Sequence, residues 1–305
     1  MTTLLTPAIT ATTVRYNSIE IDGLNVAYRE AGEESSPKLV LLHGWPSSSH
    51  QYRNLIPALA HRFHVIAPDY PGFGNSDTPD PAKFAYTFDK LADVTEHFLR
   101  AKGFERFGVF MQDYGGPVGF RIITRDPDAV EWLIIQNTNA YEAGFSEAWA
   151  GLRNALWVNR NPESEAAVAG LLEFSTVKAA YLTGSKAAEL ISPDNWNSDF
   201  YVTLQRPHGR QLQMDLFYDY RTNVQLYPEW QRYLRNVQPK TLIFWGQGDI
   251  FFTPEGGEAY LEDLPNAEIH RLEGGHFAVE DFLDHIASGM IRFYETNVAR
   301  ALAAK

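Results

Sequence analysis

The 305-residue sequence contains no cysteine. This absence excludes disulfide bonds, thiolate metal sites and a cysteine nucleophile, although it does not indicate the redox compartment. A metal site would then need histidine and carboxylate ligands, and the histidines show no paired ligand spacing with acidic residues. We therefore expect no metal.

Positive charge is also scarce, with 26 Lys and Arg residues against 38 Asp and Glu residues and a formal net charge of -12 at pH 7. Such a chain offers no basic footprint for a phosphate backbone, and anionic membrane surfaces repel it. We therefore expect no nucleic-acid partner and no membrane partner.

Long apolar runs are missing as well, so the sequence predicts no transmembrane helix. Residues 1–16 lack the basic start and the apolar stretch of a signal peptide, and we expect a cytoplasmic protein. The composition, 45% hydrophobic and 21% charged, is typical of a folded globular chain. The sequence leaves open whether copies of the chain form a homo-oligomer.

What the sequence does contain is a regular alternation of strand-like and helix-like segments. It opens with a predicted antiparallel hairpin around Asp22-Gly23, a pair suited to a type I′ turn. Short apolar runs that end in polar or glycine-containing turns follow at KLVLLHG, FHVIAPDY, FGVFMQDYGG, EWLIIQNTN, KTLIFWGQGD and AEIHRLEGGH. Helices are predicted between several of these runs, at 51–59, 90–102, 116–124 and 254–264. This order is typical of an α/β fold with a mostly parallel, doubly wound sheet, in which ligands bind beyond the carboxyl ends of the strands.

The alternation stops between residues 139 and 230. This segment is rich in aromatic residues, helix formers and turn breakers, and it has no clear strand run. We interpret residues 139–230 as a mainly helical cap, inserted between two parts of one core domain at 1–138 and 231–305. A cap in this position would cover the strand ends and enclose an apolar pocket.

The segment FGVFMQDYGGP predicts a strand, a sharp turn and a helix, which is the form of a nucleophile elbow. Its central residue is Asp113, and the turn contains no serine. Met111 stands where the usual G-x-nucleophile-x-G pattern has a small residue. Taken alone, Asp113 would fit equally well as the N-cap of the following helix.

Two further turns favour the catalytic interpretation. Asp249 lies in WGQGD after one strand-like run, and His276 lies in EGGHF after the next. The order Asp113, Asp249, His276 is that of nucleophile, acid and histidine in an α/β-hydrolase triad. The HGWP turn is predicted to point the backbone N–H of Trp45 at the nucleophile, where it would form an oxyanion hole with the N–H of Tyr114.

The motifs LLHGWPSSS, APDYPGFGNSD, MQDYGG, WGQGD and GGHF, in this order, resemble α/β-hydrolases of the epoxide hydrolase and haloalkane dehalogenase group. The resemblance covers nearly the whole chain. It implies a core sheet with an inserted helical cap, an aspartate nucleophile, and neither a metal nor an organic cofactor. In such an enzyme Asp113 attacks a carbon atom and forms an ester, which a water molecule activated by His276 hydrolyses. The expected partners are a small apolar organic substrate and water.

The leaving group stays open between an epoxide oxygen and a halide, and the sequence favours the epoxide slightly. Epoxide hydrolases protonate the epoxide oxygen with cap tyrosines, and Tyr220 in FYDYRTN resembles one of them. A second such tyrosine is not evident. We expect His43, Tyr141 and Tyr181 to line the substrate pocket, with the two tyrosines as substitutes for the missing donor.

Other features favour a haloalkane dehalogenase. Gln112 before the predicted nucleophile and Gly115-Gly116 after it resemble the elbow of that family. Its members hold the halide with indole or amide N–H groups, which Trp45 and Trp157 could supply. The arginine pattern of fluoroacetate dehalogenases is absent after the predicted nucleophile, so substrates that carry a carboxylate are not expected.

A third hypothesis is a ligand receptor that has the hydrolase fold without turnover, because fold alone does not fix function. The presence of nucleophile, acid and histidine together favours an enzyme. Stabilisation by a ligand without product formation would instead favour a receptor.

Overall fold

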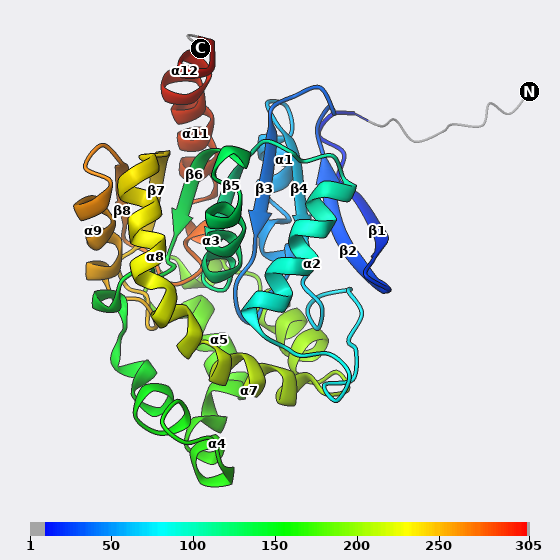
Figure 1. The fold of residues 1–305 in the computed structure, drawn as a ribbon, viewed down its shortest axis with the longest axis vertical. Coiled ribbons are helices and arrows are strands. Elements are labelled where there is room, and N and C mark those ends of the chain that lie inside the picture. The colour runs from blue at the N-terminus through cyan, green and yellow to red at the C-terminus, as the bar shows by residue number, and fades with distance from the viewer. Residues whose placement is uncertain (1–9, 304–305) are drawn as a thin grey trace, which may run out of the picture.

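The computed structural model describes residues 10–303, which form one eight-stranded sheet with helices around it (Figure 1). The strands are β1 (Arg15–Ile21), β2 (Leu24–Ala31), β3 (Lys38–Leu42), β4 (His64–Pro68), β5 (Phe107–Gln112), β6 (Val130–Gln136), β7 (Lys240–Gly246) and β8 (Glu268–Leu272). Their order in the sheet is β1-β2-β4-β3-β5-β6-β7-β8. The pairs β1–β2 and β2–β4 are antiparallel and the other pairs are parallel, which confirms the predicted mostly parallel α/β sheet.

The hairpin between β1 and β2 turns at the predicted pair. Asp22 has φ 52° and Gly23 has φ 77°, and a type I′ turn requires positive φ at both central residues. The expectation about a leader concerns residues 1–16, of which residues 1–9 lie outside the described residues.

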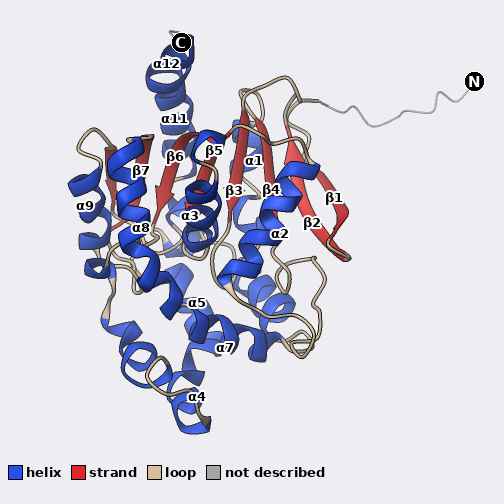
Figure 2. Cartoon of the chain, in the orientation of Figure 1, coloured by secondary structure: helices blue, strands red, loops and turns tan. Residues whose placement is uncertain are grey.

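Helices cover both faces of the sheet (Figure 2). One face packs against α2 (Phe88–Ala101), α3 (Gly115–Arg125), α8 (Arg221–Val237) and α9 (Pro254–Asp263), and the other against α1 (Leu55–Leu59) and α11 (Leu283–Phe293). Neighbouring strand residues enter different clusters because their side chains alternate between faces. Val40 and Val109 belong to the first cluster, whereas Leu39 and Phe110 belong to the second. No helix within residues 10–303 combines the length and apolar character needed to cross a membrane.

Residues 137–239, here called the helical insertion, connect β6 to β7. Its α-helices are α4 (Pro162–Val168), α5 (Phe174–Leu182), α6 (Asp194–Ser198), α7 (Gly209–Asp219) and α8. An isolated β-bridge joins Phe145 of the insertion to Phe252, in the segment after β7. Figure 1 shows α4, α5 and α7 beyond the carboxyl ends of the parallel strands. The last helix, α8, runs from there along the sheet and passes the boundary predicted at residue 230.

Candidate active site

Asp113 occupies the sharp turn between β5 and α3. Its φ is 47°, a left-handed conformation that is uncommon for a residue other than glycine and that often marks a functional turn. Two residues later, a side chain on Gly115 would lie 2.2 Å from the carbonyl oxygen of Leu42. Glycine therefore allows α3 to start directly against β3, and the turn has the elbow shape that the sequence predicts.

Met111 departs from the small residue usual in this pattern, and the structure shows how it is accommodated. A side chain on Gly119, one turn into α3, would lie 2.3 Å from the sulfur of Met111. In the usual pattern a small residue on the strand makes room for the helix. Here Gly119 on α3 makes room for the Met111 side chain on β5. The substitution therefore keeps the helix close to the strand.

The carboxyl group of Asp113 is held by backbone donors. Oδ1 accepts a hydrogen bond of 2.5 Å from the backbone N–H of Trp45, in the turn after β3. Burial raises the pKa of Asp113 to about 6, while His276 and the backbone N–H groups of Trp45 and Tyr114 act in the opposite direction. Both predicted oxyanion donors therefore face this carboxyl group.

His276 and Asp249 form a buried pair at the ends of β8 and β7. Nδ1 of His276 lies 2.9 Å from Oδ2 of Asp249, and neither side chain has any exposed surface. Burial opposes a charged imidazole, but the neighbouring carboxylate outweighs it and raises the pKa of His276 above its usual value. The rings of Phe251 and Phe252 pack against the imidazole at centroid distances of 5.1 Å and 5.8 Å.

Asn137, directly after β6, connects the Asp113 turn to the pair formed by Asp249 and His276. Its side-chain N–H₂ donates to Oδ2 of Asp249 at 2.9 Å, and its backbone carbonyl accepts from the N–H of Asp113 at 3.2 Å. Sequence reasoning missed this residue. The signal was present, because Asn137 follows an apolar strand-like run as Asp113 and Asp249 do.

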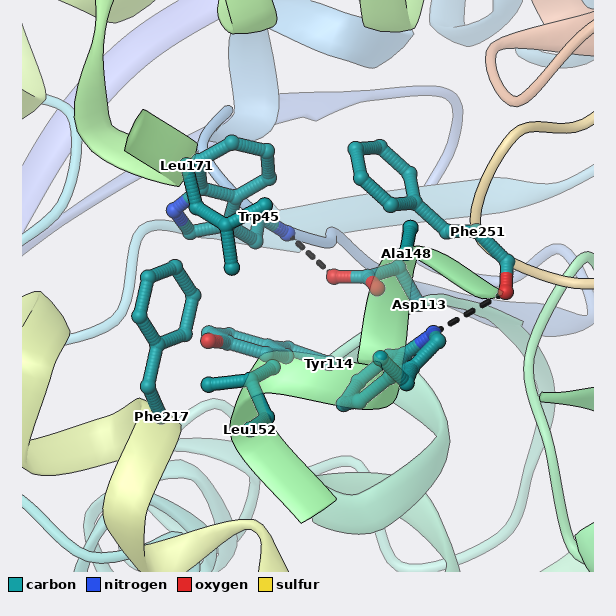
Figure 3. A pocket seen from close by; sticks show the side chains of 9 residues that line it. Trp45, Asp113, Tyr114, Ala148, Leu152, Leu171, Phe217 and Phe251 are labelled. Atoms are coloured by element: carbon teal, nitrogen blue, oxygen red, sulfur yellow. Dashed lines mark hydrogen bonds between the residues drawn. The ribbon is translucent and has the colours of Figure 1, made fainter. Parts of the chain in front are cut away.

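A small cavity opens above Asp113 (Figure 3). Its empty space is about 360 Å³, a volume that includes solvent at its opening. The lining residues are Trp45, Asp113, Tyr114, Ala148, Trp149, Leu152, Leu171, Phe217 and Phe251. Apart from the Asp113 carboxyl group, these side chains are apolar or aromatic and none is cationic. The cavity suits a small ligand without charge.

Comparison with known proteins agrees with this geometry. Residues 37–283 match the family described as the alpha/beta hydrolase fold. The chain belongs to that family. An uncharacterized hydrolase of Saccharomyces cerevisiae is 37% identical over 287 residues, which are 93% of this chain and 98% of the relative.

Two further relatives of this α/β-hydrolase have named activities. A soluble epoxide hydrolase of Corynebacterium sp. is 39% identical over 127 residues, which are 41% of this chain and 42% of the relative. A haloalkane dehalogenase of Bradyrhizobium diazoefficiens is 26% identical over 282 residues, which are 87% of this chain and 89% of the relative. Both relatives belong to the group that the sequence motifs resemble.

Tyr220, the predicted proton donor of the hydrolase, lies where α7 meets α8. Its ring centroid is 4.6 Å from that of Trp149 and 6.1 Å from that of Tyr114, and both of these rings line the cavity. Tyr220 itself does not border the cavity. Its hydroxyl is buried, and the hydroxyl of Tyr227 is its polar neighbour. Burial holds the pKa of Tyr220 well above its usual value, so the phenol stays protonated.

The two tryptophans proposed as halide donors differ. The indole N–H of Trp157 donates to the backbone carbonyl of Phe217 at 2.7 Å and is already occupied. The indole N–H of Trp45 is buried without a partner in the described chain, and Trp45 lines the cavity. Of the two, only Trp45 has a free donor.

The three residues predicted to line the pocket lie elsewhere. His43 is buried beneath the turn after β3, where its Nε2 accepts the backbone N–H of Tyr70 at 3.3 Å. The hydroxyl of Tyr141 donates to Asp263 at 2.6 Å, and that of Tyr181 donates to Asp199 at 2.5 Å. None of the three borders the cavity.

Sequence reasoning did not single out the aromatic residues that do border it. Phe217 lies within the same FYDYRTN segment as Tyr220, and Phe251 follows Asp249 by two residues. Trp149 carried no comparable signal. Its indole N–H donates to the carbonyl of Phe251 at 2.9 Å, a contact between segments distant in sequence.

Proposed function

We propose that this α/β-hydrolase uses the Asp113 carboxylate as its nucleophile and forms an alkyl ester with its substrate. One observation carries the proposal. Oδ1 of Asp113 accepts the N–H of Trp45 at 2.5 Å, while the same carboxyl group borders an apolar cavity. With Oδ1 held in this way, Oδ2 is the oxygen that attacks.

The first step opens the substrate. Oδ2 of Asp113 forms a bond to an epoxide carbon, the carbon–oxygen bond of the ring breaks, and its electron pair stays on the oxygen. Tyr220 gives its proton to that oxygen and leaves a hydroxyalkyl ester on Asp113.

The second step hydrolyses the ester. His276, paired with Asp249, takes a proton from water, and the resulting hydroxide adds to the ester carbonyl carbon. Negative charge develops on Oδ1, where the backbone N–H of Trp45 already donates. When the ester bond breaks, the leaving alkoxide takes the proton of the added hydroxyl group, so that the diol leaves and the Asp113 carboxylate returns. The proton held by His276 then passes through water to the Tyr220 phenolate, which restores the enzyme.

Epoxide opening is the activity that we place first. It needs a proton donor at the leaving oxygen, and the buried, protonated hydroxyl of Tyr220, whose ring packs against the cavity residues Trp149 and Tyr114, supports that role. The uncharged lining favours a small apolar epoxide, and water is the second substrate. We further propose that the enzyme acts in the cytoplasm.

Dehalogenation is the second candidate. The observation that favours it is that Trp45, a residue of the cavity wall, has a buried indole N–H without a partner in the described chain, and such a donor would stabilise a departing halide. The indole of Trp157, which is bound to Phe217, does not add to this support.

The test is intact mass spectrometry of His276→Gln after incubation with small epoxides and, separately, haloalkanes. Without the base the ester should accumulate, and peptide mapping should locate it on Asp113. An adduct with the mass of the whole epoxide supports epoxide hydrolysis, and an alkyl adduct that lacks the halogen supports dehalogenation. In a His276→Gln background, Asp113→Ala is the matched control and should give no adduct. Ligand-induced stabilisation without any adduct would contradict the proposal and favour a receptor.

A further inference from the structure

Two glutamine side chains contact His276, and only one of them reaches its ring. Nε2 of Gln112 lies 3.0 Å from Nε2 of His276 and also donates to the carbonyl oxygen of His276 at 3.4 Å. Gln136 donates to the same carbonyl at 3.2 Å. Both glutamines are fully buried. Gln112 directly precedes the predicted nucleophile, Asp113, in the sequence, and its side chain contacts the predicted base.

The neighbours of Gln112 fix the orientation of its amide. A carbonyl oxygen only accepts hydrogen bonds, so the group facing the carbonyl of His276 must be the N–H₂ of Gln112. On the other side, Oε1 of Gln112 accepts from Nε2 of Gln51 at 3.3 Å, while Oε1 of Gln51 accepts the N–H of Gly44 at 3.4 Å. Turning the Gln112 amide over would oppose like groups at both ends.

This orientation determines which nitrogen of His276 carries the proton. Nε2 of the imidazole faces a donor and therefore presents its lone pair, and Nδ1 carries the hydrogen that it donates to Asp249. A proton on Nε2 would set one N–H against another in a fully buried site. Gln112 therefore disfavours the imidazolium form, whereas Asp249 favours it.

From these contacts we infer that Gln112 is a positioning residue that keeps Nε2 of His276 unprotonated and ready to accept a proton from water. The inference rests on the proposed role of His276 as the base for ester hydrolysis. The charged groups that face His276 are Asp249, from the turn after β7, and Asp113, from the elbow, and both favour a positive imidazole. Its other neighbours are the rings of Phe251, Phe252 and Phe277. Gln112 is the group at the ring that opposes these two charges.

Nε2 has a single lone pair, so the Gln112 amide and the hydrolytic water compete for it. The amide holds the neutral base until the ester has formed, and water then replaces it at Nε2. Removing the amide thus affects ester hydrolysis through the protonation of His276 and leaves attack by Asp113 in place.

The test is NMR titration of the His276 side-chain nitrogens in the full-length protein, which needs no turnover. The wild type should show a proton on Nδ1 and none on Nε2. In Gln112→Met the pKa of His276 should rise by about one pH unit, because the opposing donor is gone. In Gln112→Glu it should rise by about one to three pH units, because a carboxylate would face the ring. Gln136→Met is the matched control. It removes a buried amide that bonds to the backbone carbonyl of His276 but does not contact the imidazole, so the titration of His276 should be unchanged.

The inference fails if the wild type carries a proton on Nε2, or if His276 of Gln112→Glu titrates with the pKa of the wild type. A shift of equal size in Gln136→Met would also contradict it, because the effect would then follow packing. Ester trapping separates this outcome from failure of the proposed function. If His276→Gln accumulates the Asp113 ester while Gln112 has no influence on the titration, only the role of Gln112 fails. If no ester forms, the proposed function fails whatever the titration shows.

Discussion

The strand ends and the helical insertion hold their polar side chains in different ways. At the strand ends, Asp113, Asp249 and His276 are each fixed by hydrogen bonds to backbone groups or to one another. In the insertion, the buried hydroxyls of Tyr220 and Tyr227 face each other, and neither has another hydrogen-bond partner within residues 10–303. A buried polar group without a partner costs free energy, so such groups call for a reason. The strand ends therefore hold these three side chains in one geometry, whereas the hydroxyl of Tyr220 has only Tyr227 beside it.

Replacing Tyr220 tests that difference with the largest expected effect. Tyr220→Phe removes only the hydroxyl, so the ring packing against Trp149 remains. Loss of a general acid lowers a rate by about 10²- to 10⁴-fold, and we expect a decrease in this range for ester formation from epoxides. The measurement is the rate of adduct formation in a His276→Gln background, which isolates the first step. Any haloalkane reaction should stay within a few-fold of its starting rate, because a halide leaves without a proton.

The matched control is Tyr141→Phe. Tyr141 is another buried tyrosine of the insertion, but its hydroxyl donates to Asp263 and lies away from the cavity. Adduct formation should be unchanged in this variant. Equal rates for Tyr220→Phe and the parent would contradict the donor role, and an effect of Tyr141→Phe alone would transfer that role to Tyr141.

The same contrast explains what the sequence could predict. The turn at Asp113 could be predicted because it depends on local backbone conformation. Its central residue has a strained φ, and a glycine is required two positions later, at Gly115. The order of Asp249 and His276 followed from strand alternation, because consecutive parallel strands end at one edge of the sheet. Asn137 was missed although it lies at such an edge. Its contact with Asp249 depends on the register between β6 and β7, which a single sequence does not display.

The contacts within the insertion were harder to predict, because they join segments whose apolar residues follow no shared sequence period. Its helical character was apparent, but the residues that border the cavity follow from packing between distant helices and turns. Tyr141 and Tyr181 are buried tyrosines like Tyr220, and composition does not distinguish the three. Their acidic partners, Asp263 and Asp199, were visible only in the structure.

Arg121 connects the two regions, and replacing it should have an intermediate effect. This buried side chain lies on α3, the helix that begins beside Asp113, and donates to Asn223 at 2.7 Å and to Thr222 at 3.2 Å on α8. Both acceptors follow Tyr220 closely in sequence. In Arg121→Met the predicted donor should lose its fixed place relative to the predicted nucleophile. We expect ester formation from epoxides to slow by about ten- to a hundredfold, again measured as adduct formation in a His276→Gln background.

Arg125→Met provides the control for this prediction. Arg125 lies one turn further along α3, but it pairs with Asp93 and Glu96 at the surface and does not contact α8. Its replacement should leave adduct formation near the rate of the parent. If both arginine variants slow the reaction equally, the effect reflects α3 itself rather than the connection to the insertion.

Asp113→Asn should change the stability of the protein. A carboxyl group whose pKa is raised by burial, here to about 6, contributes stability below its unfolded pKa, and that contribution is lost as the pH rises through about 6. The wild type therefore carries a buried charge at neutral pH that Asn lacks, while the Asn oxygen still accepts the N–H of Trp45. We expect Asp113→Asn to unfold with a higher free energy above about pH 7, by roughly 3 kcal/mol at most, and this advantage should shrink as the pH falls towards about 4. Denaturant unfolding of both proteins across this range measures it. If the difference in unfolding free energy between the two proteins does not depend on pH, ionisation of Asp113 does not destabilise the fold. The strand ends would then differ from the insertion only in their hydrogen bonds.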